Sequence, residues 1–169
     1  MQVDVGFGDA VTPEAQPEEF PTLLDLPAPI LLAYRRETSI AEKFEAIVNL
    51  GLTNSRMKDY YDIWLLSEQF SFDGETLMAA IIATFKSRQT ALPREAPVGL
   101  SNEFVSDAGK RAQWQAFVLR SRLDSKELSL EMVVERVAAF VMPPSNAAAE
   151  RSSFKLTWAK GGSWEVKSD

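Results

Sequence analysis

The sequence contains neither cysteine nor histidine. Without cysteine the chain has no disulfide framework and no thiolate zinc site. Without histidine it has no Ser-His-Asp triad, no imidazole ligand for a metal and no imidazole acid–base catalyst. Any catalysis must therefore rest on carboxylates, lysines, arginines, hydroxyls or a bound metal.

The sequence also lacks long apolar runs and an excess of positive charge. No run approaches the roughly 20 apolar residues of a membrane span, and no signal peptide opens the chain, so we expect a cytoplasmic protein without a membrane partner. The net charge of -6 gives no general attraction for nucleic acid, although a local basic groove is compatible with it. At 169 residues and 46% hydrophobic, the chain can bury a sizeable core.

Helical spacing of apolar residues is the main pattern that the sequence does show. It predicts five helices, over residues 39–50, 56–69, 74–88, 108–122 and 127–141. Ser39 and Glu42 have the spacing of a capping box at the start of the first helix. Asp73 is expected to cap the third helix, and Pro143 and Pro144 are expected to end the fifth.

β structure is expected only towards the two ends of the chain. Residues 2–7 alternate apolar and polar side chains, which is typical of a half-buried strand, and Asp4 lies within it. Residues 8–29 are rich in Pro and Glu, and the stretch 11–21 is expected to form an exposed loop. The prolines confine residues 22–34 to loop or edge strand. A weak hairpin is expected around residues 160–162. The predicted fold class is α+β, mostly α.

Lys43 lies on or beside the apolar stripe of the first predicted helix. Either its stem covers the core while the ammonium reaches water, or the ammonium is a point charge held near phosphate. Asp59 and Asp62 share one face of the next helix. The helix N-terminus is a sufficient structural reason for Asp59, whereas Asp62 is expected to lie deeper. We expect the Lys43 ammonium within roughly 4–6 Å of Asp62 or Asp59.

The basic residues Arg56, Lys58 and Arg88 are candidates for binding phosphate or nucleic acid, together with Lys86 and Arg94. The alternative is that they are only solvated, which is the usual state of charged residues on helix faces. Asp4 alone is a weak candidate for a metal ligand, because Mg²⁺ requires further oxygen ligands.

Three segments together resemble the AbiEii/AbiGii family of nucleotidyltransferase toxins, which belong to toxin–antitoxin systems of abortive infection, a phage defence. The segments are VDVGFGDAVTP, LLAYRRETSIAEKFEAIVNLGLTNSRMKDYYDIWLL and ATFKSRQTALP. The resemblance runs from residue 2 to about residue 142, and a W-x-x-G-G-x-W tail at 158–164 is also similar to that family. It implies a polymerase-β-like nucleotidyltransferase fold with a helical C-terminal part, Mg²⁺ as cofactor, NTP as substrate, an RNA acceptor such as tRNA and a cognate antitoxin.

The resemblance also implies roles for four of the candidate residues. Asp4 matches the third-strand acid that contributes to the metal site, and Lys43 matches the lysine of the AEK motif. Asp62, and less closely Asp59, matches the aspartate of the helical part. Lys43 is then expected to steady the triphosphate, and Asp62 to orient that lysine or the attacking hydroxyl, or to act as a base.

The chain departs from the family pattern at its start. Family members carry a Gly-Ser pair and an Asp-x-Asp on the first strands, and this segment is missing, so Met1 is expected to fall inside the family's domain. We therefore expect a remnant of the sheet at 1–35, a helical domain at 36–142, a linker and hairpin at 143–169, and weak or no activity of this chain alone. The alternative is a non-catalytic helical module that binds an antitoxin or another partner.

Overall fold

A computed structural model describes residues 12, 16–19, 22, 27–33, 35–122 and 128–167. The predicted strand with Asp4 lies outside these residues. The described α-helices are α1 (Arg36–Leu50), α2 (Met57–Gln69), α3 (Gly74–Ser87), α4 (Asn102–Ser106), α5 (Ala108–Arg120) and α6 (Leu130–Glu150). The described strands are β1 (Gln16–Glu19), β2 (Ile30–Ala33), β3 (Phe72–Asp73), β4 (Leu156–Trp158) and β5 (Trp164–Val166). The protein is α+β and mostly α, as predicted.

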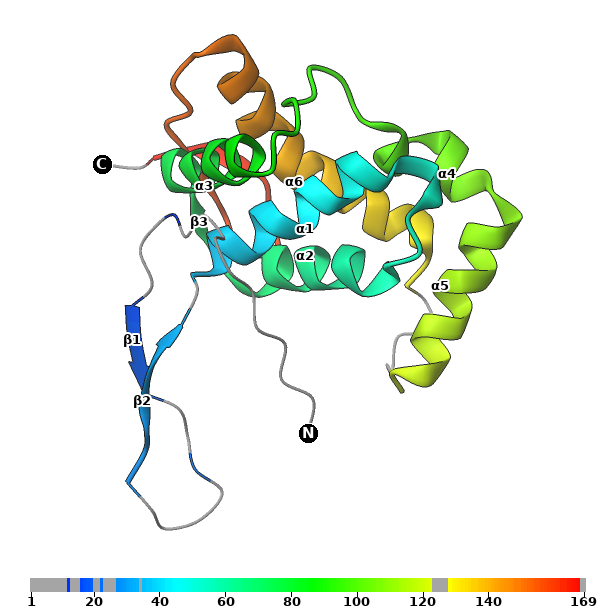
Figure 1. Ribbon diagram of the computed structural model, residues 1–169, viewed down its shortest axis with the longest axis horizontal. Coiled ribbons are helices and arrows are strands. Elements are labelled where there is room, and N and C mark those ends of the chain that lie inside the picture. The colour runs from blue at the N-terminus through cyan, green and yellow to red at the C-terminus, as the bar shows by residue number, and fades with distance from the viewer. Residues whose placement is uncertain are drawn as a thin grey trace.

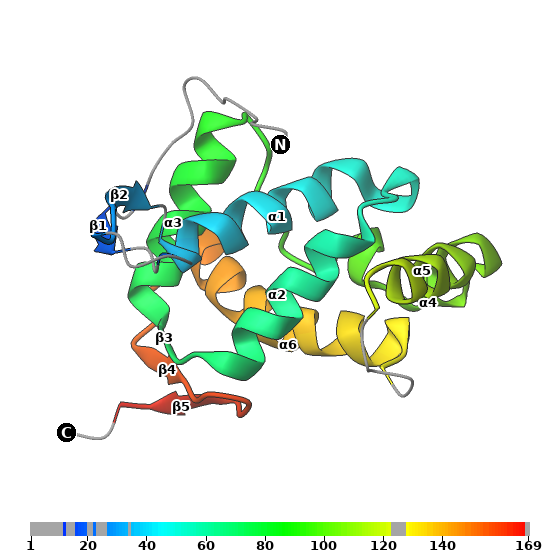
Figure 2. The ribbon, with the colours of Figure 1, turned by 90° about the horizontal axis from the view of Figure 1, so that it is seen from below.

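The helices α1, α2, α3 and α6 form the body of the molecule (Figures 1 and 2). α1 packs against α2 and α3, and α6 packs against the same two helices. The stripe predicted for α1 is its buried face, since Ile40, Phe44 and Ile47 are fully buried. The short α4 and the longer α5 lie at one end of this body, where α5 contacts α4 and α2.

The helix starts show which capping predictions hold. α1 begins at Arg36, not at residue 39, because the Ser39 amide already donates to the Arg35 carbonyl at 3.2 Å. Arg35 is the N-cap and makes no side-chain capping bond, so the predicted capping box is wrong. The predicted cap of α3 is confirmed, because the Asp73 carboxylate accepts from the Thr76 amide at 2.8 Å.

α6 does not end at the two prolines, as the sequence predicted, but runs through them to Glu150. Pro144 has no N–H to donate to the Phe140 carbonyl four residues earlier, which normally breaks a helix. In this protein the Trp164 indole donates to that carbonyl at 3.0 Å. A side chain from outside the helix therefore replaces the missing donor, and the residues expected to form a linker after 143 are helical as far as Glu150.

The predicted C-terminal hairpin is confirmed as β4 and β5, and β3 adds a third antiparallel strand that was not predicted. The tail motif fixes this sheet to α2. The Trp158 indole and the Gly161 amide both donate to the Ser67 carbonyl, at 2.9 and 3.2 Å. Gly161 has φ +64°, a left-handed conformation that favours glycine, and the turn of the hairpin therefore requires a glycine at this position of the motif.

The segment predicted as an exposed loop contains β1, which pairs antiparallel with β2. β2 is the apolar run that follows Pro29, where the sequence allowed an edge strand. β1 carries Pro17, and a two-stranded ribbon tolerates proline because each strand has an outer edge that needs no amide donor. Figure 1 shows the ribbon extending away from the helices.

Candidate functional site

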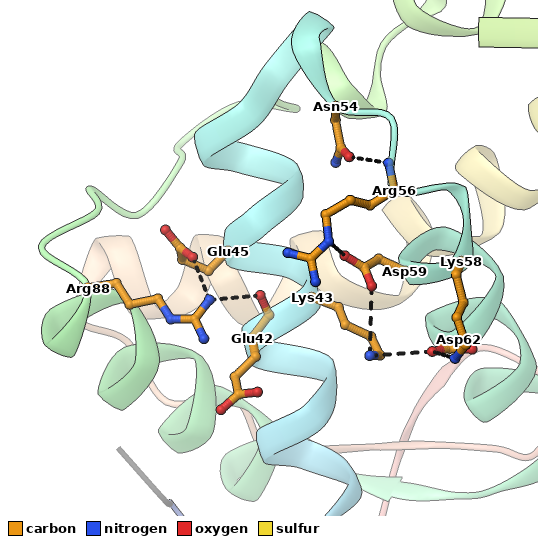
Figure 3. Close-up of polar contacts among 9 residues, drawn as sticks. All are labelled: Glu42, Lys43, Glu45, Asn54, Arg56, Lys58, Asp59, Asp62 and Arg88. Atoms are coloured by element: carbon orange, nitrogen blue, oxygen red, sulfur yellow. Dashed lines mark hydrogen bonds and ion pairs between the residues drawn. The ribbon is translucent and has the colours of Figure 1, made fainter. Parts of the chain in front are cut away.

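The centre of the candidate site is the lysine beside the buried stripe of α1. The Lys43 side chain is 23% exposed, and its Nζ lies 3.3 Å from Asp62 Oδ2 and 3.8 Å from Asp59 Oδ1, both on α2 (Figure 3). The structure therefore brings together the three residues that the sequence predicted to converge. It also fixes the direction of the lysine, which points across the α1–α2 contact.

Two further cations approach the same carboxylates from the start of α2. Arg56 Nε lies 3.0 Å from Asp59 Oδ2, and Lys58 Nζ lies 2.6 Å from Asp62 Oδ2. These five residues are here named the Lys43 cluster. It holds three cations and two carboxylates, so one positive charge is not neutralised within it. Such a surplus beside a partly exposed lysine side chain favours the binding of an anion.

The two aspartates differ in burial, in the opposite sense to the prediction. The Asp59 side chain is 6% exposed and the Asp62 side chain is 19% exposed. Asp59 shares its helical face with the buried Ile63 four residues later, whereas Asp62 shares a face with the exposed Lys58. Burial raises the pKa of the Asp59 carboxyl, against the opposing effect of the neighbouring Arg56 and Lys43. Asp59 is therefore the carboxyl of the cluster whose charged form is disfavoured by its burial.

Arg88 does not join Arg56 and Lys58 in one basic patch. It lies on the other side of α1, where Nη1 is 2.9 Å from Oε2 of Glu45 (Figure 3). The Glu45 side chain is only 3% exposed and needs a cation beside it. The geometry thus gives Arg88 a structural ion pair and separates it from the Lys43 cluster.

The fit of a divalent metal can be tested on the described residues. No group of three or more carboxylate side chains that could hold a metal ion occurs among them. Asp59 and Asp62 are already contacted by Lys43, Arg56 and Lys58, which would repel a metal ion. The described part of the chain therefore does not fit Mg²⁺, and the predicted ligand Asp4 lies outside it.

The sequence analysis missed a groove that adjoins the cluster. It has a volume of about 530 Å³ and is lined by Ser55, Arg56, Met57, Lys58, Gln113, Ala116, Phe117, Arg120 and Ser121. A local signal was available, because residues 108–122 include four basic residues and no acidic residue. The net charge of the whole chain conceals this local excess.

The fold and the site define a mostly helical protein in which two aspartates hold a partly exposed lysine. The cluster around this lysine has a surplus positive charge and is suited to binding anionic groups. A family model described as "Nucleotidyl transferase AbiEii toxin, Type IV TA system" matches residues 1–141. The chain belongs to this family of nucleotidyltransferase toxins. No curated protein and no solved structure matches the chain.

The family match has consequences for the partners of the chain. It includes every member of the Lys43 cluster and stops short of the β4–β5 hairpin. Membership in a toxin–antitoxin family of nucleotidyltransferases implies an NTP substrate and an antitoxin partner. Among the helices that the structure describes, none has the length and hydropathy needed to cross a membrane.

Proposed function

We propose that the Lys43 cluster is the phosphate-contacting part of a nucleotidyltransferase site, and that the reaction transfers a nucleotide from NTP to RNA, with tRNA as the acceptor. One observation carries this proposal. The ammonium of Lys43 is oriented by two carboxylates, the lysine side chain is 23% exposed, and the residue belongs to a cluster with surplus positive charge. A lysine that served only to cover the core would not need two buried or half-buried acids to aim it.

The reaction that this site would serve forms one bond and breaks one. The acceptor hydroxyl oxygen bonds to the α-phosphorus of the NTP, the bond from that phosphorus to the leaving pyrophosphate breaks, and the hydroxyl proton passes to water. Negative charge is spread over the phosphate oxygens in the transition state. A preoriented ammonium stabilises that charge more than the charge of the free substrate.

The contacts also support separate roles for the two aspartates. Asp62 Oδ2 is contacted by the ammonium groups of both Lys43 and Lys58, so we assign it to orienting Lys43 rather than to removing a proton. Asp59 is too buried to touch a substrate. It is a positioning residue that acts through Lys43 and Arg56.

The test is transfer of label from a mixture of the four NTPs to bulk tRNA in the presence of Mg²⁺. Because the sequence contains no Asp-x-Asp, the chain is assayed alone and together with a polypeptide that carries the family's Gly-Ser and Asp-x-Asp strands. We expect transfer by the mixture, weak or none by the chain alone, and a large loss with Lys43→Ala. Full transfer by the Lys43→Ala variant would remove this lysine from the mechanism.

A second candidate function is a non-catalytic module that binds the antitoxin. The absence of a metal-ligand group among the described residues favours it. Antitoxin binding without transfer under any of these conditions would replace the enzyme proposal with this one.

A further inference from the structure

We propose that the groove between the start of α2 and one face of α5 binds the single-stranded end of the RNA acceptor and directs it to the Lys43 cluster. The identity of the strand as an acceptor rests on the proposed function. The binding of single-stranded RNA does not, and it can be measured separately.

The first argument is the charge of the groove walls. Arg56 and Lys58 come from the start of α2, and Arg120 comes from the last turn of α5. Among the residues that the structure describes, no acidic residue lines the groove. On α5 the lining residues follow the spacing i, i+3, i+4 and i+7, which places them on one face of the helix: Gln113, Ala116, Phe117 and Arg120.

The second argument is charge segregation along the chain. The protein carries a net charge of -6, yet residues 108–122 contain four basic residues and no acid. A helix that is only solvated usually mixes both signs. Of these four, Arg120 lines the groove, whereas the Lys110 ammonium donates to the Asn54 carbonyl at 2.8 Å. Charges more than about 8 Å away are largely screened at physiological salt, so the three cations that line the groove decide what it attracts, rather than the net charge of the chain. The groove is therefore attractive to a polyanion despite the acidic protein.

The third argument is the aromatic ring of Phe117 in the groove lining, which favours single-stranded nucleic acid over other polyanions. Phe117 is half-buried, and its ring lies 5.7 Å from the Tyr61 ring and 5.5 Å from the Trp114 ring. These contacts hold the Phe117 ring in place where it lines the groove. Cations that contact the backbone, beside an aromatic ring on which a base can stack, are the usual elements of single-strand binding.

The fourth argument is that the groove and the Lys43 cluster share residues. Lys58 lines the groove and contacts Asp62 at 2.6 Å, and the same carboxylate oxygen contacts Lys43 at 3.3 Å. Arg56 also lines the groove and pairs with Asp59 at 3.0 Å. A strand whose phosphates occupy the groove is thus separated from Lys43 by one carboxylate. This continuity connects RNA binding with nucleotide transfer.

The test is fluorescence anisotropy of a labelled single-stranded RNA with the 169-residue protein, without NTP and without Mg²⁺. Arg120→Glu reverses a charge in the groove. Arg111→Glu makes the same change at an exposed position nine residues earlier, which is two and a half turns away and therefore on the opposite face of α5. We expect a loss of affinity of about tenfold or more for Arg120→Glu and less than about twofold for Arg111→Glu.

A milder variant covers the case in which the reversed charge perturbs the end of α5. Arg120→Ala should lower the slope of log affinity against log salt by about 0.7, the value for one phosphate contact on a single strand. Equal losses of RNA affinity for the variants at 120 and 111 would show that RNA is attracted to the helix as a whole, and the proposed binding in the groove would be wrong. Unchanged affinity of both variants at 120 would overturn it as well.

Two competitors identify the occupant. Duplex RNA should displace the labelled strand less well than unlabelled single strand, because its bases cannot stack on Phe117. If polyglutamate binds and loses affinity with Arg120→Glu while RNA does not, the groove takes an acidic protein segment and the proposal is wrong. RNA binding through Arg120 without nucleotide transfer would support the RNA-binding groove and contradict the proposed transferase function. Transfer to tRNA that is insensitive to Arg120→Glu would support the transferase function and contradict the groove.

Discussion

Lys43 and Asp62 face each other across the contact between α1 and α2, with 3.3 Å between Nζ and Oδ2. The same oxygen lies 2.6 Å from Lys58 Nζ, so one carboxylate serves two ammonium groups. An isolated ion pair on a protein surface neutralises itself and contributes little to stability. Here Asp62 orients Lys43 without cancelling the charge of the cluster.

The first prediction concerns this shared carboxylate. Asp62→Asn should lower transfer by the active mixture about 10²-fold, because Lys43 loses the charge that orients it toward the phosphate. The matched control is Glu68→Gln, the same chemical change on the same helix at a residue that pairs with Arg136 outside the cluster. It should stay within about twofold of the wild type.

The second prediction concerns the pH dependence of stability. The pKa of Asp59 in the folded state is raised above its ordinary value of 3.8, which we take for the unfolded state. At a pH between 3.8 and the raised pKa, the folded state therefore binds more protons than the unfolded state. The stabilising contribution of this carboxyl is complete below pH 3.8 and is lost as the pH rises through the raised pKa. Asp59→Asn cannot titrate, and its free energy of unfolding should therefore increase relative to the wild type across that window.

Urea unfolding of both proteins at a series of pH values between about 3.5 and 7 measures this difference. A difference that is constant, or that decreases with pH, would contradict the burial argument. Because the same variant removes a contact of Lys43, we expect it to lose transfer activity while it gains stability at neutral pH. That combination is typical of a residue kept for function at a cost in stability.

The third prediction separates Arg88 from the residues proposed to bind RNA. Arg88→Ala leaves the buried Glu45 carboxylate without its cation and should destabilise the fold by about 2 kcal/mol. In a Glu45→Gln background the same substitution should cost less, because no buried charge is then left behind. RNA affinity should not change. A tenfold loss of RNA affinity without loss of stability would return Arg88 to the binding surface.

The convergence of Lys43 with the aspartates was predicted from the spacing of the AEK and DYYD segments, and the structure confirms it. Positions on one helix face are fixed by the helical period, and short connections force neighbouring helices together. The depth of each aspartate was not predictable in this way. It depends on how α2 is rotated against α1, and that rotation is set by packing over the whole body.

The pairing of strands that are far apart in the chain could not be predicted from the sequence either. β3 pairs with β4, with Phe72 opposite Trp158, and a two-residue strand has no pattern that identifies a partner so far along the chain. The groove beside α5 was missed for a different reason. Its charges were judged against the acidic chain as a whole, whereas the groove forms only once α5 lies beside the start of α2.

The last prediction concerns the helix that continues through its prolines. Trp164→Phe keeps an aromatic ring beside Phe140 but removes the N–H that satisfies the Phe140 carbonyl, and should destabilise the protein by about 1–3 kcal/mol. Pro144→Ala restores a backbone N–H for the same carbonyl. In that background Trp164→Phe should therefore lower the free energy of unfolding by about 1 kcal/mol less than it does in the wild type. The unfolding free energies of the wild type, the two single variants and the double variant measure this coupling. Trp158→Phe is the control, because its indole donates to Ser67 and its cost should not depend on residue 144. If the costs at 164 and 144 are simply additive, the indole does not replace the missing donor, and the continuation of α6 requires another cause.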